Sequence, residues 1–161
     1  MIRHARPADQ AAIHVVETAA FGQADEADLV DRLRADGDVV IELVEEIEGR
    51  IVGHILFSRL WADRVDLFAA LAPMAVLPEH QKSGVGGRLV RAGIEACRDF
   101  GAHGVLVLGH RDYYPRFGFS REAALAVTSP YSASPAFMAL ALEDGAFDQP
   151  LTVAYPSAFG G

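Results

Sequence analysis

The segment over residues 65–109 constrains the fold of this chain more than any other part of the sequence. The apolar run "VDLFAALAPMAVLP" predicts a buried strand, and "QKSGVGG" follows as a glycine-rich loop. "GRLVRAGIEACRDFG" has the apolar spacing of an amphipathic helix, and "HGVLVLG" predicts a second short strand. A helix that connects two strands allows them to lie parallel in one sheet. The sequence therefore predicts a strand–loop–helix–strand unit at the centre of the fold.

The flanking segments predict two earlier helices and several more strands. "RPADQAAIHVVETAAFG" and "DEADLVDRLRADG" have apolar residues three and four apart and end at Gly22 and Gly37. "DVVIELVEEIEGRIVGHILFSRL" predicts two strands joined at Glu48-Gly49. "RDYYPRFGF" predicts a brief helix or turn, and "AFMALAL" and "LTVAY" predict late strands. We expect an α+β fold in a single domain over residues 1–161, with a mixed, mostly antiparallel central sheet and flanking helices.

Composition and charge exclude several classes of protein. The chain has 161 residues, 51% hydrophobic and 22% charged, as a folded domain has. No apolar run reaches the roughly 18 residues of a membrane span, and "MIRHARPADQ" lacks the apolar segment of a signal peptide, so we expect a cytoplasmic protein. The formal charge of −8 argues against nucleic-acid binding, although it also fits a role in solubility alone.

The basic residues favour a small anionic ligand at the glycine loop. Only 14 residues are Lys or Arg, and their densest group lies in or after that loop. These residues are Lys82, Arg88, Arg91 and Arg98.

The single cysteine and the histidines give no sign of a disulfide or a metal site. Cys97 falls on the apolar stripe of the predicted helix, where we expect a core residue rather than a nucleophile. The six histidines include no pair at helical three-or-four spacing and no His-x-His. We therefore expect no metal.

Three phosphate-binding loops can be compared with the glycine-rich loop. A P-loop needs a lysine and a hydroxyl residue after its last glycine, where this chain has Arg88 and Leu89. The dinucleotide fingerprint requires a glycine at the position of Leu89. The pattern Q/R-x-x-G-x-G/A matches at every defined position from Gln81 to Gly86. Its backbone N–H groups at a helix N-terminus can hold a pyrophosphate that is not cleaved, and coenzyme A is a ligand of that kind.

A Tyr-x-x-x-Gly-Phe segment, Tyr114 to Phe119, follows one strand and turn later. Together with "MAVLPEHQKSGVGG", it resembles the GNAT superfamily of acetyl-CoA-dependent N-acetyltransferases, and the resemblance spans nearly the whole chain. "FMALAL" and "VAYPSAF" are further similar to a small bacterial branch of predicted acetyltransferases. The resemblance implies the GNAT acyl-CoA N-acyltransferase fold, acetyl-CoA as the acyl donor and an amine acceptor. Dimers are common among such proteins, so it also allows a homodimer.

The resemblance assigns roles to individual residues. Tyr114 matches the tyrosine that protonates the departing CoA thiolate, although a packed aromatic residue is the structural alternative. The backbone around Ala75 and Val76 would pair with the pantetheine arm, and an N–H there would polarise the thioester carbonyl. The loop residues expected to bind the cofactor are Gln81, Lys82, Ser83, Gly84, Val85, Gly86 and Gly87.

The resemblance does not supply a general base. Histone-type members carry a glutamate early on the cofactor strand, whereas residues 68–72 of this chain read Phe-Ala-Ala-Leu-Ala. His110 is our first candidate, acting through water, because it follows the "GVLVLG" strand and histidine ordinarily titrates near neutral pH. The other candidates, each with a structural or solvated alternative, are Glu26, His54, Asp66 and Glu79.

Three functions remain open from the sequence. The leading one is direct transfer of an acetyl group from acetyl-CoA to a primary amine in a ternary complex, because no cysteine lies in the motif to carry the acetyl group. The missing strand carboxylate motivates a second, a non-catalytic acyl-CoA-binding or regulatory module. The third is an N-acyltransferase that uses a longer acyl-CoA. The acidic charge favours a cationic amine as the acceptor.

Overall fold

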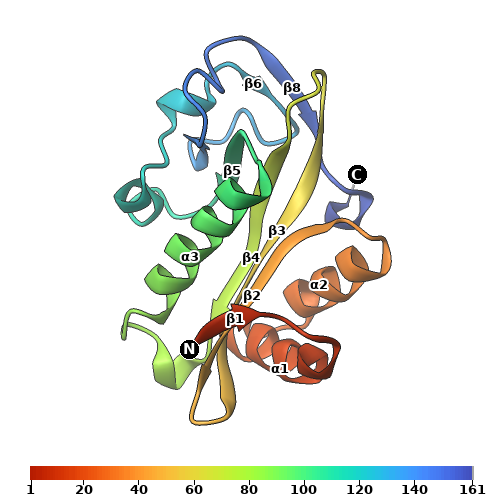
Figure 1. The fold of residues 1–161 in the computed structure, drawn as a ribbon, viewed down its shortest axis with the longest axis vertical. Helices are drawn as coiled ribbons and strands as arrows, with labels where there is room; N and C mark the ends of the chain where they lie inside the picture. The colour runs from red at the N-terminus through yellow and green to blue at the C-terminus, as the bar shows by residue number, and fades with distance from the viewer. Residues whose placement is uncertain (161) are drawn as a thin grey trace.

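The computed structural model describes residues 1–160, which form a central sheet with helices on both faces (Figure 1). The sheet has the strand order β1-β2-β3-β4-β5-β7, and β8 pairs with both β3 and β6. Neighbouring strands are antiparallel except for the pairs β4–β5 and β6–β8, which are parallel. This arrangement confirms the predicted α+β fold class and the central crossover unit.

The strands are β1 (Ile2–His4), β2 (Val39–Ile47), β3 (Arg50–Ala62), β4 (Phe68–Val76), β5 (Gly104–Leu108), β6 (Val127–Thr128), β7 (Phe137–Ala141) and β8 (Leu151–Ala154). The α-helices are α1 (Gln10–Phe21), α2 (Asp25–Ala35) and α3 (Val85–Phe100). Short 3-10 turns are η1 (Pro7–Asp9), η2 (Pro78–His80), η3 (Tyr114–Phe117), η4 (Glu122–Ala124) and η5 (Ser157–Phe159).

The β2–β3 hairpin has the tight turn that its sequence predicts. Glu48 and Gly49 both adopt positive φ angles, 51° and 77°, and the flanking Ile47 pairs with Arg50. Positive φ at both central residues is the geometry of a two-residue turn that follows the strand twist. The hairpin therefore begins at the predicted residues, and β3 continues from it as the long strand between β2 and β4.

Two adjacent residues of β3 show how the helices are divided between the faces of the sheet. Side chains of neighbouring strand residues point to opposite faces. A Cβ at Gly53 would lie 2.8 Å from Val85 and Leu89 of α3, whereas His54 contacts Glu17 of α1. α3 therefore covers one face, and α1 with its neighbour α2 covers the other (Figure 1).

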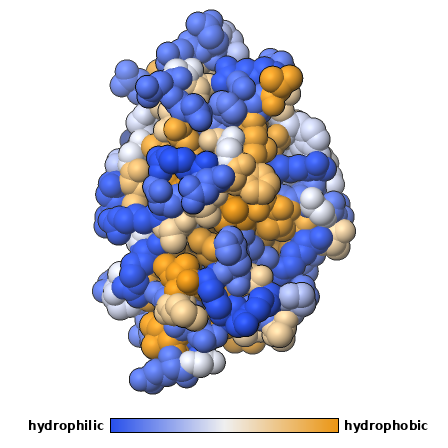
Figure 2. Space-filling model, in the orientation of Figure 1, coloured by the Kyte–Doolittle hydropathy of each residue, from blue (hydrophilic) through white to orange (hydrophobic). Residues whose placement is uncertain are grey.

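The buried apolar residues form two clusters. The larger lies between the sheet and its helices, and the smaller lies where β3 and β4 meet β7 and β8. Cys97 is fully buried in the larger cluster, and burial raises the pKa of its thiol to about 12, which confirms the expected core role. On the outside, hydrophilic residues dominate the face in Figure 2, with apolar groups between them. Among residues 1–160, no helix is long and apolar enough to cross a membrane.

The structure differs from the expected elements in two places. β1 and β6 were not expected, because three and two residues are too few to show a period. α3 begins at Val85, so Gly86 and Gly87 belong to its first turn rather than to the loop. Tertiary packing of the helix start against the sheet overrides the low helix propensity of glycine there.

Gly93 gives a test of how closely α3 approaches the sheet. A Cβ at this position would lie 2.3 Å from the buried ring of Phe57 on β3. We expect Gly93→Ala to lower the free energy of unfolding by about 1–3 kcal/mol, because the core must move to accept the methyl group. Chemical denaturation measures this. The double variant Gly93→Ala/Phe57→Leu should show less than the sum of the two single losses, and simple additivity would contradict the packing.

Candidate active site

The candidate site begins where β4 separates from β5. The two strands pair only from Phe68–Gly104 to Leu71–Val107, and Leu108 pairs with Phe137 of β7 instead. On its other edge β4 remains paired with β3 as far as Val76. Within the part of the chain that the structure describes, residues 72–76 therefore have no strand neighbour on the β5 side.

The hydrogen bonds of β4 determine which peptide groups face this open edge. The Leu77 N–H donates to the Val52 carbonyl at 2.8 Å, and in antiparallel pairing the direction alternates from residue to residue. The peptide groups of Met74 and Val76 therefore face the open edge, and those of Ala75 face β3. Gln81 Nε2 donates to the Val76 carbonyl at 2.9 Å, which ties the loop to this edge. Met74 is a residue that sequence reasoning missed.

The glycine loop turns the chain into α3 beside that edge. Gly84 adopts φ 90° as the N-cap of α3, and Lys82 adopts φ 63°. Gly86 and Gly87 leave the first turn of the helix without side chains, so a ligand can approach the backbone closely. Ser83 donates its hydroxyl to the His80 carbonyl inside the loop.

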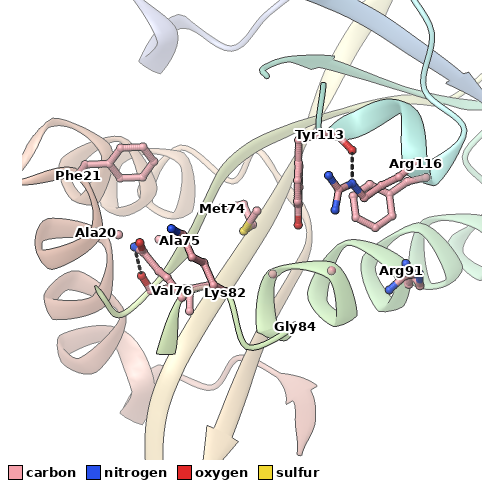
Figure 3. A pocket seen from close by; sticks show the side chains of 14 residues that line it. Ala20, Phe21, Met74, Ala75, Val76, Lys82, Gly84, Arg91, Tyr113 and Arg116 are labelled. Atoms are coloured by element: carbon pink, nitrogen blue, oxygen red, sulfur yellow. Dashed lines mark hydrogen bonds between the residues drawn. The ribbon is translucent and has the colours of Figure 1, made fainter. Parts of the chain in front are cut away.

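A cavity of about 640 Å³ lies between this loop, β4 and η3 (Figure 3). Figure 3 shows the Tyr113 ring between Met74 and Arg116, with Phe21 on α1 and Arg91 on α3. The cavity, which we call the donor cavity, is lined by Ala20, Phe21, Met74, Ala75, Val76, Gln81, Lys82, Gly84, Gly86, Gly87, Arg91, Tyr113, Arg116 and Phe117. Of the predicted cofactor residues, Ser83 and Val85 do not line it, and Val85 is buried in the core.

The donor cavity is basic although the protein is acidic. Lys82, Arg91 and Arg116 line it, and no ion pair joins any of them to a carboxylate within residues 1–160. Arg116 Nε donates to the Tyr113 carbonyl at 3.0 Å, and its guanidinium lies over the Tyr113 ring. The sequence indicated Lys82 and Arg91 but not Arg116. Positive charges near exposed backbone N–H groups at a helix start suit a phosphate-bearing ligand.

Two other basic residues of the predicted group form ion pairs outside the cavity. Arg88 Nε lies 2.9 Å from Glu45 Oε1 of β2, and Arg98 pairs with Glu95 on the surface of α3. Of the predicted basic group, Lys82 and Arg91 therefore line the cavity, and Arg116 joins them there.

A second cavity of about 460 Å³ adjoins the first, and we call it the acceptor-side cavity. Both cavities are lined by Phe21, Met74 and Tyr113, so these three residues mark the junction. The acceptor-side cavity is lined by Phe21, Glu26, Leu29, Leu71, Ala72, Pro73, Met74, Leu108, Gly109, His110, Tyr113 and Tyr114.

Tyr114 is held firmly against its neighbours. Only 7% of its surface is exposed, and its ring packs edge-on against Tyr113 and Phe119. Burial raises the pKa of Tyr114 to about 12, so the phenol keeps its proton at neutral pH. A neutral phenol that lines a cavity can donate a proton. Tyr114 can therefore be both a packed aromatic residue and a proton donor.

The structure separates the five candidate bases. Glu26 and His110 both line the acceptor-side cavity. Asp66 lies 2.8 Å from Arg64 Nε, and Glu79 lies 3.7 Å from Arg50, both outside the two cavities. His54 is fully buried and lines neither cavity.

His54 belongs to a buried chain of charged groups that sequence reasoning missed. Its Nδ1 lies 2.6 Å from Glu17 Oε2 of α1, and its Nε2 lies 2.7 Å from Glu42 Oε2 of β2. Glu42 also accepts hydrogen bonds from Arg34 of α2. The network therefore connects α1, α2 and two strands on one face of the sheet.

The ionisable groups in this network shift one another's pKa values. Burial by itself lowers the pKa of His54, but its hydrogen bonds with Glu17 and Glu42 outweigh burial and the net shift is upward. Burial raises the pKa of Glu17, and this effect is larger than the lowering caused by its hydrogen bond with His54. For Glu42 burial acts in the same direction, but His54 and Arg34 overcome it and the pKa is lowered. These directions favour the protonated imidazole between the two carboxyl groups.

One group of possible metal ligands lies on the outer surface of α1 and α2. His14 Nε2 lies 3.4 Å from Asp28 Oδ1 and 3.8 Å from Asp31 Oδ2, and both aspartates are exposed. Surface ion pairs account for this arrangement. The expectation of no metal stays a prediction.

Comparisons with known proteins agree with this geometry. Residues 9–119, more than half of the chain, match the model of the acetyltransferase (GNAT) family. The uncharacterized N-acetyltransferase YjhQ of Escherichia coli K12 is 50% identical over 116 residues, 69% of this chain and 64% of that relative. The chain thus spans less than two thirds of the length of this relative. The uncharacterized N-acetyltransferase YhbS of the same strain is 34% identical over 125 residues, 76% of this chain and 75% of the relative.

Two solved structures share the fold along nearly the whole chain. The crystal structure of YhbS from Escherichia coli in complex with CoA has a TM-score of 0.91 at 30% identity and covers 100% of this chain and 92% of its own. A GNAT family acetyltransferase from Brucella melitensis in complex with acetyl-CoA has a TM-score of 0.82 at 36% identity, with 99% and 97% covered.

The buried network predicts a loss of stability when its imidazole is removed. We expect His54→Gln to lower the free energy of unfolding by about 3–5 kcal/mol, because two carboxyl groups then lose their buried cation. Urea denaturation measures this. His4→Gln is the matched control, because His4 is exposed and its substitution should change stability little.

The same variant tests the direction of the His54 shift. A raised native pKa stabilises the fold fully below the ordinary histidine pKa near 6.5, and this contribution is lost as pH rises through the native pKa. The unfolding free energy of the unmodified chain should therefore fall relative to that of His54→Gln as pH rises above about 6.5. A difference that stays constant as pH rises above about 6.5 would show that the native pKa of His54 is not raised.

Proposed function

The chain belongs to the acetyltransferase (GNAT) family, and on that premise we propose that it transfers the acetyl group of acetyl-CoA to a primary amine. The acceptor is a small molecule or a protein, and transfer is direct, in a ternary complex. One observation carries the proposal: the donor cavity and the acceptor-side cavity meet at Phe21, Met74 and Tyr113. Two substrates bound in them would bring a thioester and an amine together at that junction.

The donor cavity fits coenzyme A in its charges and its backbone groups. The pyrophosphate would lie against the N-terminus of α3 and the loop residues Gln81 to Gly87, near Lys82. The pantetheine arm would lie along the open edge of β4, where the peptide groups of Met74 and Val76 have no strand partner in the described part of the chain. A backbone N–H at this edge would stabilise the negative charge that develops on the thioester oxygen. The predicted Ala75 lines the same cavity.

The transfer itself needs one base and one acid. A neutral amine attacks the thioester carbonyl carbon, the new C–N bond forms, and the C–S bond breaks. The proton that the amine loses passes through water to His110, and Tyr114 gives a proton to the departing CoA thiolate. Both side chains line the acceptor-side cavity, which supports these roles. Location in the cytoplasm and homodimer formation stay predictions of the sequence.

A screen of amines with acetyl-CoA tests the function. We expect acetyl-CoA to bind and raise the melting temperature, and we expect release of free CoA thiol when an accepted amine is present. Binding without thiol release for any amine class would instead support an acyl-CoA-binding module. Faster transfer from longer acyl-CoA donors would support the acyltransferase alternative.

The role of Tyr114 predicts a specific loss of activity. We expect Tyr114→Phe to keep the Kd for acetyl-CoA and to lower kcat by about 10²-fold or more, because only the proton donor is removed. Tyr131→Phe is the matched control, since Tyr131 packs on Tyr155 away from both cavities and should keep full activity. An unchanged kcat for Tyr114→Phe across pH, with a loss for Tyr113→Phe, would transfer the role to Tyr113.

A further inference from the structure

The walls of the acceptor-side cavity are mainly apolar. Phe21 and Leu29 come from α1 and α2, Leu71 and Pro73 from β4, and Leu108 from the end of β5. Phe21 and Leu108 remain 45% and 47% exposed. An apolar ligand body in this cavity would remove their surface from water.

The charged groups of this cavity differ in sign from those of the donor cavity. Among residues 1–160, Glu26 is the only carboxylate that lines this cavity, and no lysine or arginine lines it. His110 and the two tyrosines are the other ionisable side chains that line it in the described part of the chain. An acceptor with its own carboxylate would find no fixed positive charge here, and a polycation would find one negative charge.

Two acids of α2, Asp25 and Glu26, have no ion pair within residues 1–160, but Asp25 is exposed and only Glu26 lines the cavity. Glu26 is half-buried in the first turn of α2 and accepts a hydrogen bond from Gln23 Nε2 at 3.3 Å. Asp28 lies beside His14 and Asp31 beside Arg34, whereas no ion pair involves Glu26 within residues 1–160. A partly buried carboxylate without a counter-ion is a ready partner for an ammonium group.

We propose that the acceptor is a small primary amine with an apolar, aromatic or branched aliphatic body and no carboxylate. Glu26 binds the amino group in its ammonium form, which becomes the nucleophile after its proton has passed through water to His110. The side chains of Phe21, Leu29 and Leu108 pack on the body of the amine. A cavity of about 460 Å³ is of the size that encloses such a molecule. This inference rests on the proposed acetyltransferase function and narrows its acceptor.

Three amines that differ in charge test the acceptor class. 2-Phenylethylamine has the proposed chemistry, phenylalanine adds a carboxylate to the same ring and amine, and spermidine is a polycation without an apolar body. We expect kcat/KM with acetyl-CoA, measured by thiol release, to be at least tenfold higher for 2-phenylethylamine than for either of the others. Equal or higher values for phenylalanine or spermidine would overturn the proposal while leaving the acetyltransferase function intact.

Variants of α2 test the role of Glu26. We expect Glu26→Gln to raise the KM for 2-phenylethylamine at least tenfold and to leave the Kd for acetyl-CoA unchanged. Asp25→Asn removes the same charge from the adjacent, exposed position and should keep the KM. An equal rise in both variants would show a general effect of charge and would overturn the assignment to Glu26.

A binding measurement separates this inference from the proposed function. Calorimetric titration of 2-phenylethylamine into the CoA-loaded protein requires no turnover. Binding that Glu26→Gln weakens and Asp25→Asn preserves supports the inference, even if no amine is acetylated and the proposed function fails. Absence of binding at millimolar amine, with CoA bound, would overturn the inference.

Discussion

The short parallel ladder between β4 and β5 is the constraint on which the rest of the site depends. The ladder ends at Leu71 and Val107, and β5 then follows β7 while β4 follows β3. Backbone N–H and C=O groups in a protein interior need hydrogen-bond partners. The groups on an open strand edge beside a cavity therefore need partners from outside the sheet. The Gln81 side chain donates a hydrogen bond to one carbonyl of this edge, that of Val76. The remaining groups are available to an extended ligand, which is how a strand edge recognises one.

On both faces of the sheet, ion pairs with at least one buried partner connect the helices to the strands. On one face His54 connects Glu17 of α1 to Glu42, which Arg34 of α2 also contacts. On the other face Arg88 of α3 pairs with the buried Glu45 of β2. Such pairs cost desolvation energy, so their value lies in fixing where each helix lies on the sheet. The start of α3 and the end of α1 both line the donor cavity, and their positions follow from these contacts.

The distribution of charge separates the two substrates. The whole chain has a formal charge of −8, yet the donor cavity is lined by three basic residues that have no ion pair with a carboxylate within residues 1–160. The acceptor-side cavity has one carboxylate and mainly apolar walls. A phosphate-bearing donor and an amine acceptor would thus meet surfaces of opposite character on either side of Tyr113. Net charge alone does not describe this arrangement, because local potential depends on the nearest few groups.

The sequence by itself determined the α+β class, the central crossover unit, the hairpin at Glu48-Gly49 and the glycine loop, because each depends on local periodicity or on backbone conformations that few residues adopt. The contribution of Arg116 and the open edge at Met74 came only from the tertiary structure. The tertiary structure also showed that Glu26 and His110, which are far apart in the chain, line one cavity. It showed that His54 is buried, which removes His54 from the candidate bases. Residue types and spacing carry local information, whereas cavities and ion pairs depend on which distant segments the sheet brings side by side.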